Sequence, residues 1–160
     1  MTEGTKSYLF GCHHFFMHPL FVLIAWVKLY RSWPKPWELA CIFLHDIGHI
    51  GKQYLSDYNQ KKTHWVLGAE IAYKLFGMKG YEMVAGHVTQ AGVLRSKLYR
   101  PDKHSWVIAW KWWLELNRIV EPQLQSATVE EFQTAVKENI ESGYIHGNHD
   151  IYLYYSRVNK

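Results

Sequence analysis

The sequence predicts an all-α fold, a bundle of helices arranged around a central metal site. Apolar residues recur at helical spacing in segments that prolines and glycines separate. Histidines and aspartates stand at the ends or on the apolar faces of these segments, and the apolar run Cys41–Leu44 ends directly in His45 and Asp46. Buried polar groups need partners, and a metal ion satisfies an imidazole and a carboxylate together.

The first expected helix runs from about His18 to Arg31. Pro19 suits a first helical turn, and an apolar stripe of Leu20, Leu23, Ile24 and Val27 is expected to face the core. His14 and His18 are four residues apart, which places both on one face if the helix starts early. If the helix starts at Pro19, His18 only neighbours its cap, so the choice between these two histidines stays open.

The second expected helix runs from Pro36 to about Ile47 and ends at Gly48. Asp46 shares a face with the apolar residues Leu39, Ile42 and Phe43, so its carboxylate is expected to point into the core. His45 and Asp46 offer nitrogen and oxygen ligands of the kind that bind Mn, Fe, Co, Ni or Zn. Without a metal, the pair would only end the helix.

Two further helices each bring one histidine inward. The third is expected from Thr63 to Gly77, with a buried face that His64 opens and that Leu67, Gly68, Ile71 and Leu75 continue. The fourth is expected from Tyr81 to Thr89, with His87 on its apolar side. A single inward histidine is more often a core residue than a ligand, so these positions gain weight only together.

A basic loop precedes the fifth expected helix and carries Arg95, Lys97, Arg100 and Lys103. Asp102 lies within this loop and is either a metal ligand or the N-cap of the helix, which extends past Trp106 to Leu114. The last expected helix opens with the capping-box pattern Thr128 to Glu131 and ends at Gly143. The structure of the tail 144–160 stays open.

Length and composition are those of one ordinary domain, residues 1–160, with a helical core at about 10–117 and a C-terminal helix and tail at 118–160. Cys12 and Cys41 lie in apolar surroundings without metal-site spacing, which indicates reduced core thiols of a cytoplasmic protein. The apolar run Pro19–Val27 is too short to cross a bilayer.

A net charge of +4 suits a small anionic substrate, and nothing in the pattern supports nucleic-acid binding. The oligomeric state stays open.

The segment His45-Asp46-Ile47-Gly48, with its apolar lead-in, resembles the dyad motif of the HD-domain superfamily, and the resemblance covers about residues 10 to 117. It implies an all-helical fold that holds one or two divalent transition metals. It implies as ligands His14, with His18 as the substitute, then His45, Asp46 and Asp102. The added histidines His64 and His87 are those of two-metal members, in which the dyad aspartate bridges both ions.

The sequence departs from that family pattern at two points. Many two-metal relatives have a lysine three residues after the dyad aspartate, whereas this chain has His49 there and Lys52 one turn later. Asp102 also follows His87 more closely than expected of the signalling phosphodiesterases, whose Gly-Tyr-Pro signature is absent too. Cyclic dinucleotides are therefore not the expected substrate.

The resemblance favours a metal-dependent phosphohydrolase that acts on phosphomonoesters, nucleotides or phosphodiesters. Two metals can activate water and clamp an in-line attack at phosphorus. Asp46 would bridge the metals, and His49 would carry a proton, since an imidazole titrates in the useful range. Charge for the substrate phosphate would come from Lys52 or from the basic loop, that is, from Arg95, Lys97, Arg100 and Lys103.

Two other functions fit the same residues. Di-iron oxygenases of the HD type, similar to inositol and phosphonate oxygenases, use the same ligand pattern to cleave C–H or C–P bonds. A non-catalytic binding module would hold a structural metal with a closed coordination sphere.

The segment Gly147-Asn148-His149-Asp150 resembles a block of calcineurin-type metallophosphoesterases, but the other blocks of that family are missing. His146 and His149 are therefore expected to be surface or tail residues.

Overall fold

A computed structural model describes residues 1–54, 59, 62–119 and 128–141. All regular structure in these residues is helical, as the sequence predicts. None of the described helices combines the length and apolarity needed to span a bilayer. The elements are α1 (Glu3–Phe10), α2 (Met17–Tyr30), α3 (Pro36–Leu44), the 3₁₀ turn η1 (Ile47–His49), α5 (Trp65–Phe76), α6 (Met78–Ala85), α7 (Tyr99–Ile108), α8 (Lys111–Asn117) and α9 (Val129–Glu141).

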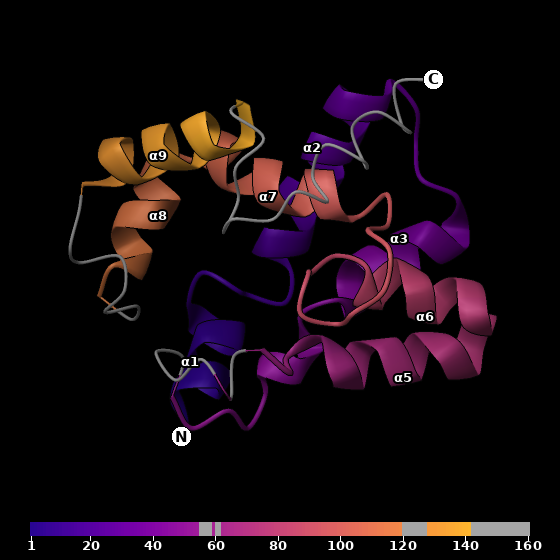
Figure 1. The fold of residues 1–160 in the computed structure, drawn as a ribbon. Coiled ribbons are helices and arrows are strands. Elements are labelled where there is room, and N and C mark those ends of the chain that lie inside the picture. Colours follow the sequence, from indigo (N-terminus) through magenta and orange to yellow (C-terminus); the bar gives the residue numbers. More distant parts are fainter. Residues whose placement is uncertain (55–58, 60–61, 120–127, 142–160) are drawn as a thin grey trace.

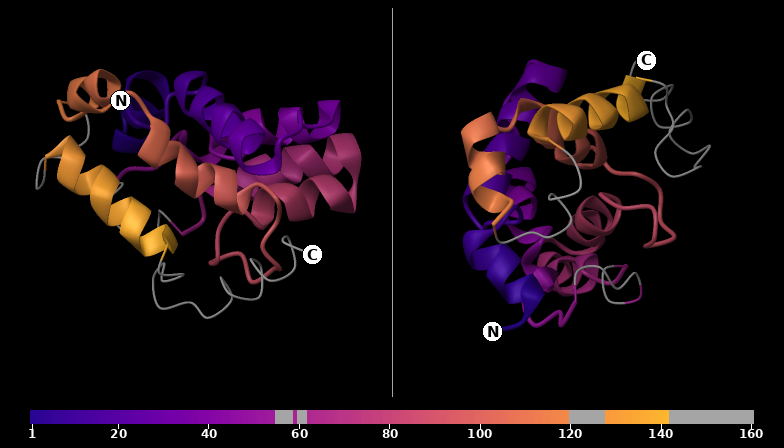
Figure 2. Two further views of the ribbon diagram at one scale, coloured as in Figure 1. Left: turned by 90° about the horizontal axis from the view of Figure 1, so that it is seen from above. Right: turned by 90° about the vertical axis from the view of Figure 1, so that its left-hand side faces the viewer.

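The helices form two packed groups, which Figures 1 and 2 show. One group joins α3, α5 and α6, and the other joins α2, α7 and α9, with α2 also touching α3. Each group has its own apolar cluster, and α2 contributes to both, through Val22 and Trp26 on one side and Phe21 on the other. The polar residues discussed below lie where α2, α3, α5, α6 and α7 meet.

Helix α2 buries a different face from the one its sequence pattern indicates. The buried side chains are His18, Phe21, Val22, Ala25 and Trp26, whereas the expected stripe of Leu20, Leu23, Ile24 and Val27 is only half-buried. The helix is apolar on every side, so periodicity cannot tell which face is inward. The observed face is the one that carries His18 into the protein.

Helices α5 and α6 pack closely because small residues stand at their contacts. A Cβ atom on Gly80 would lie 2.4 Å from the carbonyl oxygen of Ala72, and one on Gly68 would lie 2.3 Å from that of Leu44. Ala69 and Ala72 are buried there, while Leu67 and Leu75 are exposed, contrary to the expected apolar face. Close backbone packing, rather than large apolar side chains, therefore holds α5 in place.

Three element boundaries differ from the sequence prediction. The dyad helix stops at Leu44, so His45 and Asp46 lie in the turn that leads into η1. The fourth helix ends at Ala85, so His87 follows it. The fifth splits into α7 and α8 at the extended residues Ala109 and Trp110. The capping box of α9 is confirmed, since Thr128 and Glu131 exchange backbone-to-side-chain hydrogen bonds of 2.8 and 3.2 Å.

Helix α1 was not predicted. Its amides bond the segment after the dyad, with Gly4 N donating to the Lys52 carbonyl at 2.9 Å, and the Thr5 hydroxyl accepts from Gly51 N at 2.9 Å. A Cβ atom on Gly4 would lie 2.2 Å from the His49 carbonyl oxygen. The N-terminal helix thus packs directly on the backbone that carries His49.

Candidate metal centre

Six side chains from five elements converge on one buried point. They stand at helix ends or in first turns, where a side chain can reach the interior without interrupting a helix. His18 opens α2, the dyad follows α3, His64 precedes α5, His87 follows α6, and Asp102 lies in the first turn of α7. All are buried except His64, whose side chain is 12% exposed.

The first group of donor atoms surrounds one carboxylate oxygen of Asp46. Its Oδ2 lies 3.3 Å from His18 Nε2 and 3.4 Å from His45 Nε2. Those two nitrogens are 3.2 Å apart, and Asp102 Oδ1 lies 3.1 Å from the first and 3.6 Å from the second. Ligands about 2.1 Å from one ion are roughly 3.0 to 3.4 Å apart around an octahedron or a tetrahedron, so this set has the spacing of a metal site.

The second group surrounds the other oxygen of the same carboxylate. Asp46 Oδ1 lies 3.6 Å from His64 Nε2 and 3.7 Å from His87 Nε2, and these nitrogens are 3.1 Å apart. His49 Nε2 is 3.8 Å from the same oxygen, and its ring stacks on that of His64. Asp46 therefore faces a separate set of imidazoles with each of its oxygens.

Backbone carbonyls fix the orientation of two of these imidazoles. His45 Nδ1 bonds the Ile42 carbonyl at 2.6 Å, and His87 Nδ1 bonds the Val84 carbonyl at 2.5 Å. A carbonyl can only accept, so each Nδ1 carries a proton and each Nε2 is turned toward the centre. This is the arrangement that metal-binding histidines commonly have. The donors are the nitrogen and oxygen atoms that transition metals take, so the residues present fit one or two such ions.

The charges of the centre are strongly coupled. Burial alone would raise the pKa values of Asp46 and Asp102, but neighbouring cations and imidazoles lower both well below the usual range, chiefly His45 for Asp46 and Lys103 for Asp102. Burial lowers the pKa of His45, yet Asp46 and Asp102 outweigh it and raise that pKa to about 9. Burial, the largest effect, lowers the pKa of His87. The metal-free centre thus holds two carboxylates and a protonated His45.

Metal uptake is therefore expected to release the His45 proton. At every pH below the folded pKa of His45 of about 9, this proton competes with the metal. Each pH unit below 9 should weaken apparent affinity by about tenfold for this one proton, so Mn²⁺ should bind up to about 100-fold more weakly at pH 6.5 than at pH 8.5. Titration of chelator-treated protein with Mn²⁺ at both pH values measures this. Equal affinities would contradict it.

Of the two candidate first ligands, the structure brings His18 to the centre and leaves His14 outside. His14 is half-buried, and its Nδ1 accepts the backbone amides of Phe16 and Met17 at 3.2 and 3.3 Å, before the first turn of α2. His18, 2% exposed, bonds Asp102. The helix begins at Met17, before the proline. His18, which the sequence analysis gave as the substitute for His14, therefore occupies the position of the first ligand.

Asp102 lies inside α7 rather than at its start. The N-cap position is Leu98, and Asp102 N donates to the Leu98 carbonyl at 3.0 Å within the first turn. The alternative that Asp102 only caps the helix is therefore wrong. Its carboxylate faces His18 with Oδ1 and accepts from Lys103 Nζ with Oδ2 at 2.7 Å.

The residues proposed to act beside the metals lie at different depths. His49 is 1% exposed and lies among the centre's imidazoles. Lys52 donates from Nζ to the Thr63 hydroxyl at 2.6 Å, one residue before His64. Lys52 thus borders the second group of donors.

The basic loop divides into two pairs. Lys103 bonds Asp102, and its Nζ and the guanidinium of Arg95 lie 5.6 and 4.1 Å from the ring centroid of Tyr99. Lys97, whose side chain is 59% exposed, lies 3.8 Å from Glu38. Arg100 lies near His104, whose pKa is lowered by burial and then by Arg100. Lys103 directly contacts one of the six converging residues, Asp102.

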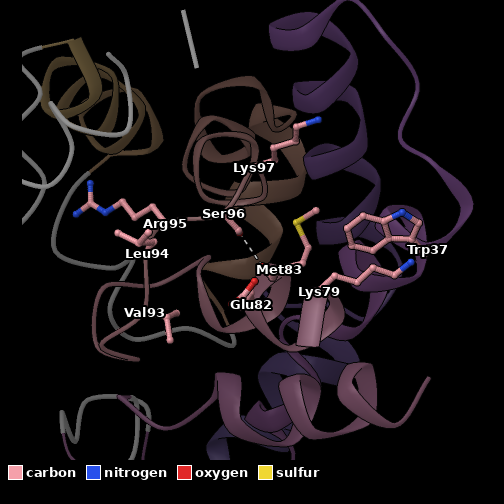
Figure 3. Close-up of a pocket in the computed structure, with 9 residues that line it drawn as sticks. All are labelled: Trp37, Lys79, Glu82, Met83, Val93, Leu94, Arg95, Ser96 and Lys97. Carbon is pink, nitrogen blue, oxygen red and sulfur yellow. Dashed lines mark hydrogen bonds between the residues drawn. The ribbon is translucent and has the colours of Figure 1, made fainter. Parts of the chain in front are cut away.

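Lys97 and Arg95 also line a cavity of about 530 Å³ between α3, α6 and the loop (Figure 3). Its other lining residues are Trp37, Lys79, Glu82, Met83, Val93, Leu94 and Ser96. In Figure 3, the Arg95 side chain points away from Trp37 and Lys79. None of the converging histidines or aspartates lines this cavity, so the sequence prediction that Lys97 serves the metal centre gains no support from its position.

Three residues near the centre were missed by the sequence analysis. A ring nitrogen of His13 lies within 4.8 Å of donor atoms of both Asp46 and His49. Trp106 stacks on His18, with ring centroids 4.9 Å apart. The pKa of Tyr8 is raised by burial and by Asp46. His13 precedes α2 in a segment without helical periodicity, so nothing in its spacing indicated an inward position.

No family model, curated protein or solved structure matches this chain.

The predicted thiols Cys12 and Cys41 are buried, and neither forms a disulfide. The predicted tail residues His146 and His149 lie outside the described residues.

Proposed function

We propose that this protein is an HD-domain phosphohydrolase with a dinuclear metal centre, acting on small phosphate esters. The observation that carries the proposal is that each carboxylate oxygen of Asp46 faces its own set of imidazole nitrogens. One carboxylate shared in this way suits two ions better than one. The all-helical fold and the positions of the ligand residues along the chain also support membership of this superfamily.

The residues divide between the two ions. The first ion would be held by His18, His45 and Asp102, and the second ion by His64 and His87. Asp46 would be a ligand of both ions. When bound, such ions would supply an activated water molecule and neutralise phosphate charge. The number of protein ligands would leave positions open on octahedral ions, unlike the closed sphere of a structural site.

The chain itself would bind and orient the substrate. Lys103, next to Asp102, is the basic-loop cation placed to attract a phosphate toward the first ion. Arg95 lies on the same Tyr99 ring but also lines the separate cavity, so its position supports that role less. His49, at the Asp46 Oδ1 side, would hold the proton that the leaving oxygen needs. The near-complete burial of the donors favours a small substrate over a polymer.

The deciding experiment compares phosphate release with oxygen consumption. Protein loaded with Mn²⁺ or Co²⁺ should hydrolyse phosphate esters anaerobically, because attack of water at phosphorus needs no redox change. Solvent ¹⁸O should enter the released phosphate. A panel of phosphomonoesters, nucleotides and phosphodiesters under argon provides the measurement. Turnover that requires both iron and dioxygen would replace the proposal with the oxygenase of the same fold, and loaded protein that turns over neither class would favour the binding module.

A further inference from the structure

His13 is an imidazole near the centre that has no role in the ligand sets or in the proposed proton transfer. Its ring centroid lies 4.1 Å from that of His49, which in turn stacks on His64 at 4.6 Å. The rings of His13 and His64 thus both neighbour His49, and the His13 ring also lies edge-on to that of His18, with ring centroids 6.0 Å apart. Trp106 meets the His13 ring edge-on at 5.6 Å and fixes it from another side.

Ser7 sets the orientation of that ring. The buried Ser7 Oγ lies 2.8 Å from His13 Nδ1. Nε2 is therefore the ring nitrogen that points away from Ser7. If the hydroxyl donates to Nδ1, Nε2 carries the ring proton of the neutral imidazole and is a hydrogen-bond donor. Ser7 is held in α1, the helix that also packs on the backbone of His49.

The charge at the centre indicates what such a donor would meet. Asp46 and Asp102 are the carboxylates of the described centre, and together they compensate half the charge of two divalent ions. A third cation beside His13 would share Asp46 with the second ion and add repulsion, whereas an anion would reduce the remaining positive charge. The position next to His13 and His49 thus suits an anionic oxygen better than a further metal.

We propose that His13, oriented by Ser7, forms an anion subsite beside His49 at the centre and donates a hydrogen bond to an oxygen of a phosphate-like oxyanion. This inference rests on the proposed function insofar as it requires a metal-loaded centre. It adds a substrate-binding residue to the one already proposed, Lys103, the cation beside Asp102.

The test measures binding of inorganic phosphate to Mn²⁺-loaded protein by calorimetry, beside metal analysis of the same samples. His13→Ala should weaken phosphate binding by about tenfold without loss of Mn²⁺, because a lost hydrogen bond to a charged group costs about 1.5 kcal/mol or more. Ser7→Ala should weaken it about threefold. His13→Gln, which retains an N–H donor, should recover most of the affinity. His14→Ala is the matched control, since it removes the neighbouring histidine outside the centre and should leave phosphate affinity unchanged.

Several results would overturn the subsite. Unchanged phosphate affinity in metal-replete His13→Ala would remove His13 from the site, and loss of an ion from that variant would make it a metal ligand instead. Loaded wild-type protein that fails to bind phosphate would also refute the inference. If wild-type protein hydrolyses esters but His13→Ala binds phosphate normally, only the subsite fails. If phosphate binding depends on His13 but no ester is hydrolysed, only the proposed function fails.

Discussion

Replacement of Asp46 by alanine is expected to empty the metal centre and abolish turnover. Each oxygen of this carboxylate faces a different group of imidazoles, so its loss removes one ligand from both sites at once. The variant also loses one of the two buried carboxylates of the centre, and His64 and His87 remain there without their acidic partner. We expect the metal content to fall from about two ions per chain to less than half an ion, and turnover to fall by at least about 100-fold.

His87→Ala provides the comparison that makes this result specific. His87 Nε2 lies beside Asp46 Oδ1 and His64, while its ring meets that of His45 only edge-on, with centroids 4.9 Å apart. Its removal should therefore release mainly one ion and leave the His18, His45 and Asp102 group occupied. Metal analysis after purification without added metal distinguishes the two variants. If Asp46→Ala retains both ions, or if Asp46→Ala and His87→Ala lose the same amount, Asp46 does not bridge two sites.

Much of the centre could be predicted because its residues stand next to strong local signals. His45 and Asp46 end an apolar run, and Gly48 marked the end of the expected helix, which the structure ends at Leu44. His64 and His87 were predicted to point inward, and the structure places both at the centre, although the apolar face expected around His64 is wrong. The ligand residues were thus predictable even where the packing around them was not.

The remaining residues depend on contacts between segments distant in sequence. His18 replaces His14 because α2 begins at Met17, two residues before Pro19, and no local pattern decides that start. His13 reaches the centre only because Ser7 of α1 and Trp106 of α7 hold its ring. From the sequence, the basic loop was expected to form one charged surface. In the structure, Lys97 contacts Glu38 of α3, whereas Lys103 contacts Asp102. Tertiary packing, rather than residue type, separates these roles.

The second large effect is expected at Gly48, because the backbone there leaves no space for a side chain. A Cβ atom at this position would lie 1.8 Å from the carbonyl oxygen of His64. Contact with a carbonyl oxygen can be relieved only by moving backbone, either η1 or the residues before α5, and each carries an imidazole of the centre. Gly48→Ala should therefore shift His64 relative to Asp46. We expect it to lower the free energy of unfolding by about 3 kcal/mol or more and to cost most of the second ion.

Gly51→Ala is the matched control, since Gly51 lies three residues later in the same segment. It has a φ of +83°, so alanine would be strained there, but no atom lies within 4 Å of its Cβ position. That strain should cost about 1 kcal/mol and leave the metal content unchanged. Chemical denaturation gives both stabilities, and metal analysis gives the occupancy. A Gly48→Ala protein with the metal content and stability of Gly51→Ala would show that the close approach of η1 to His64 does not position the second group of ligands.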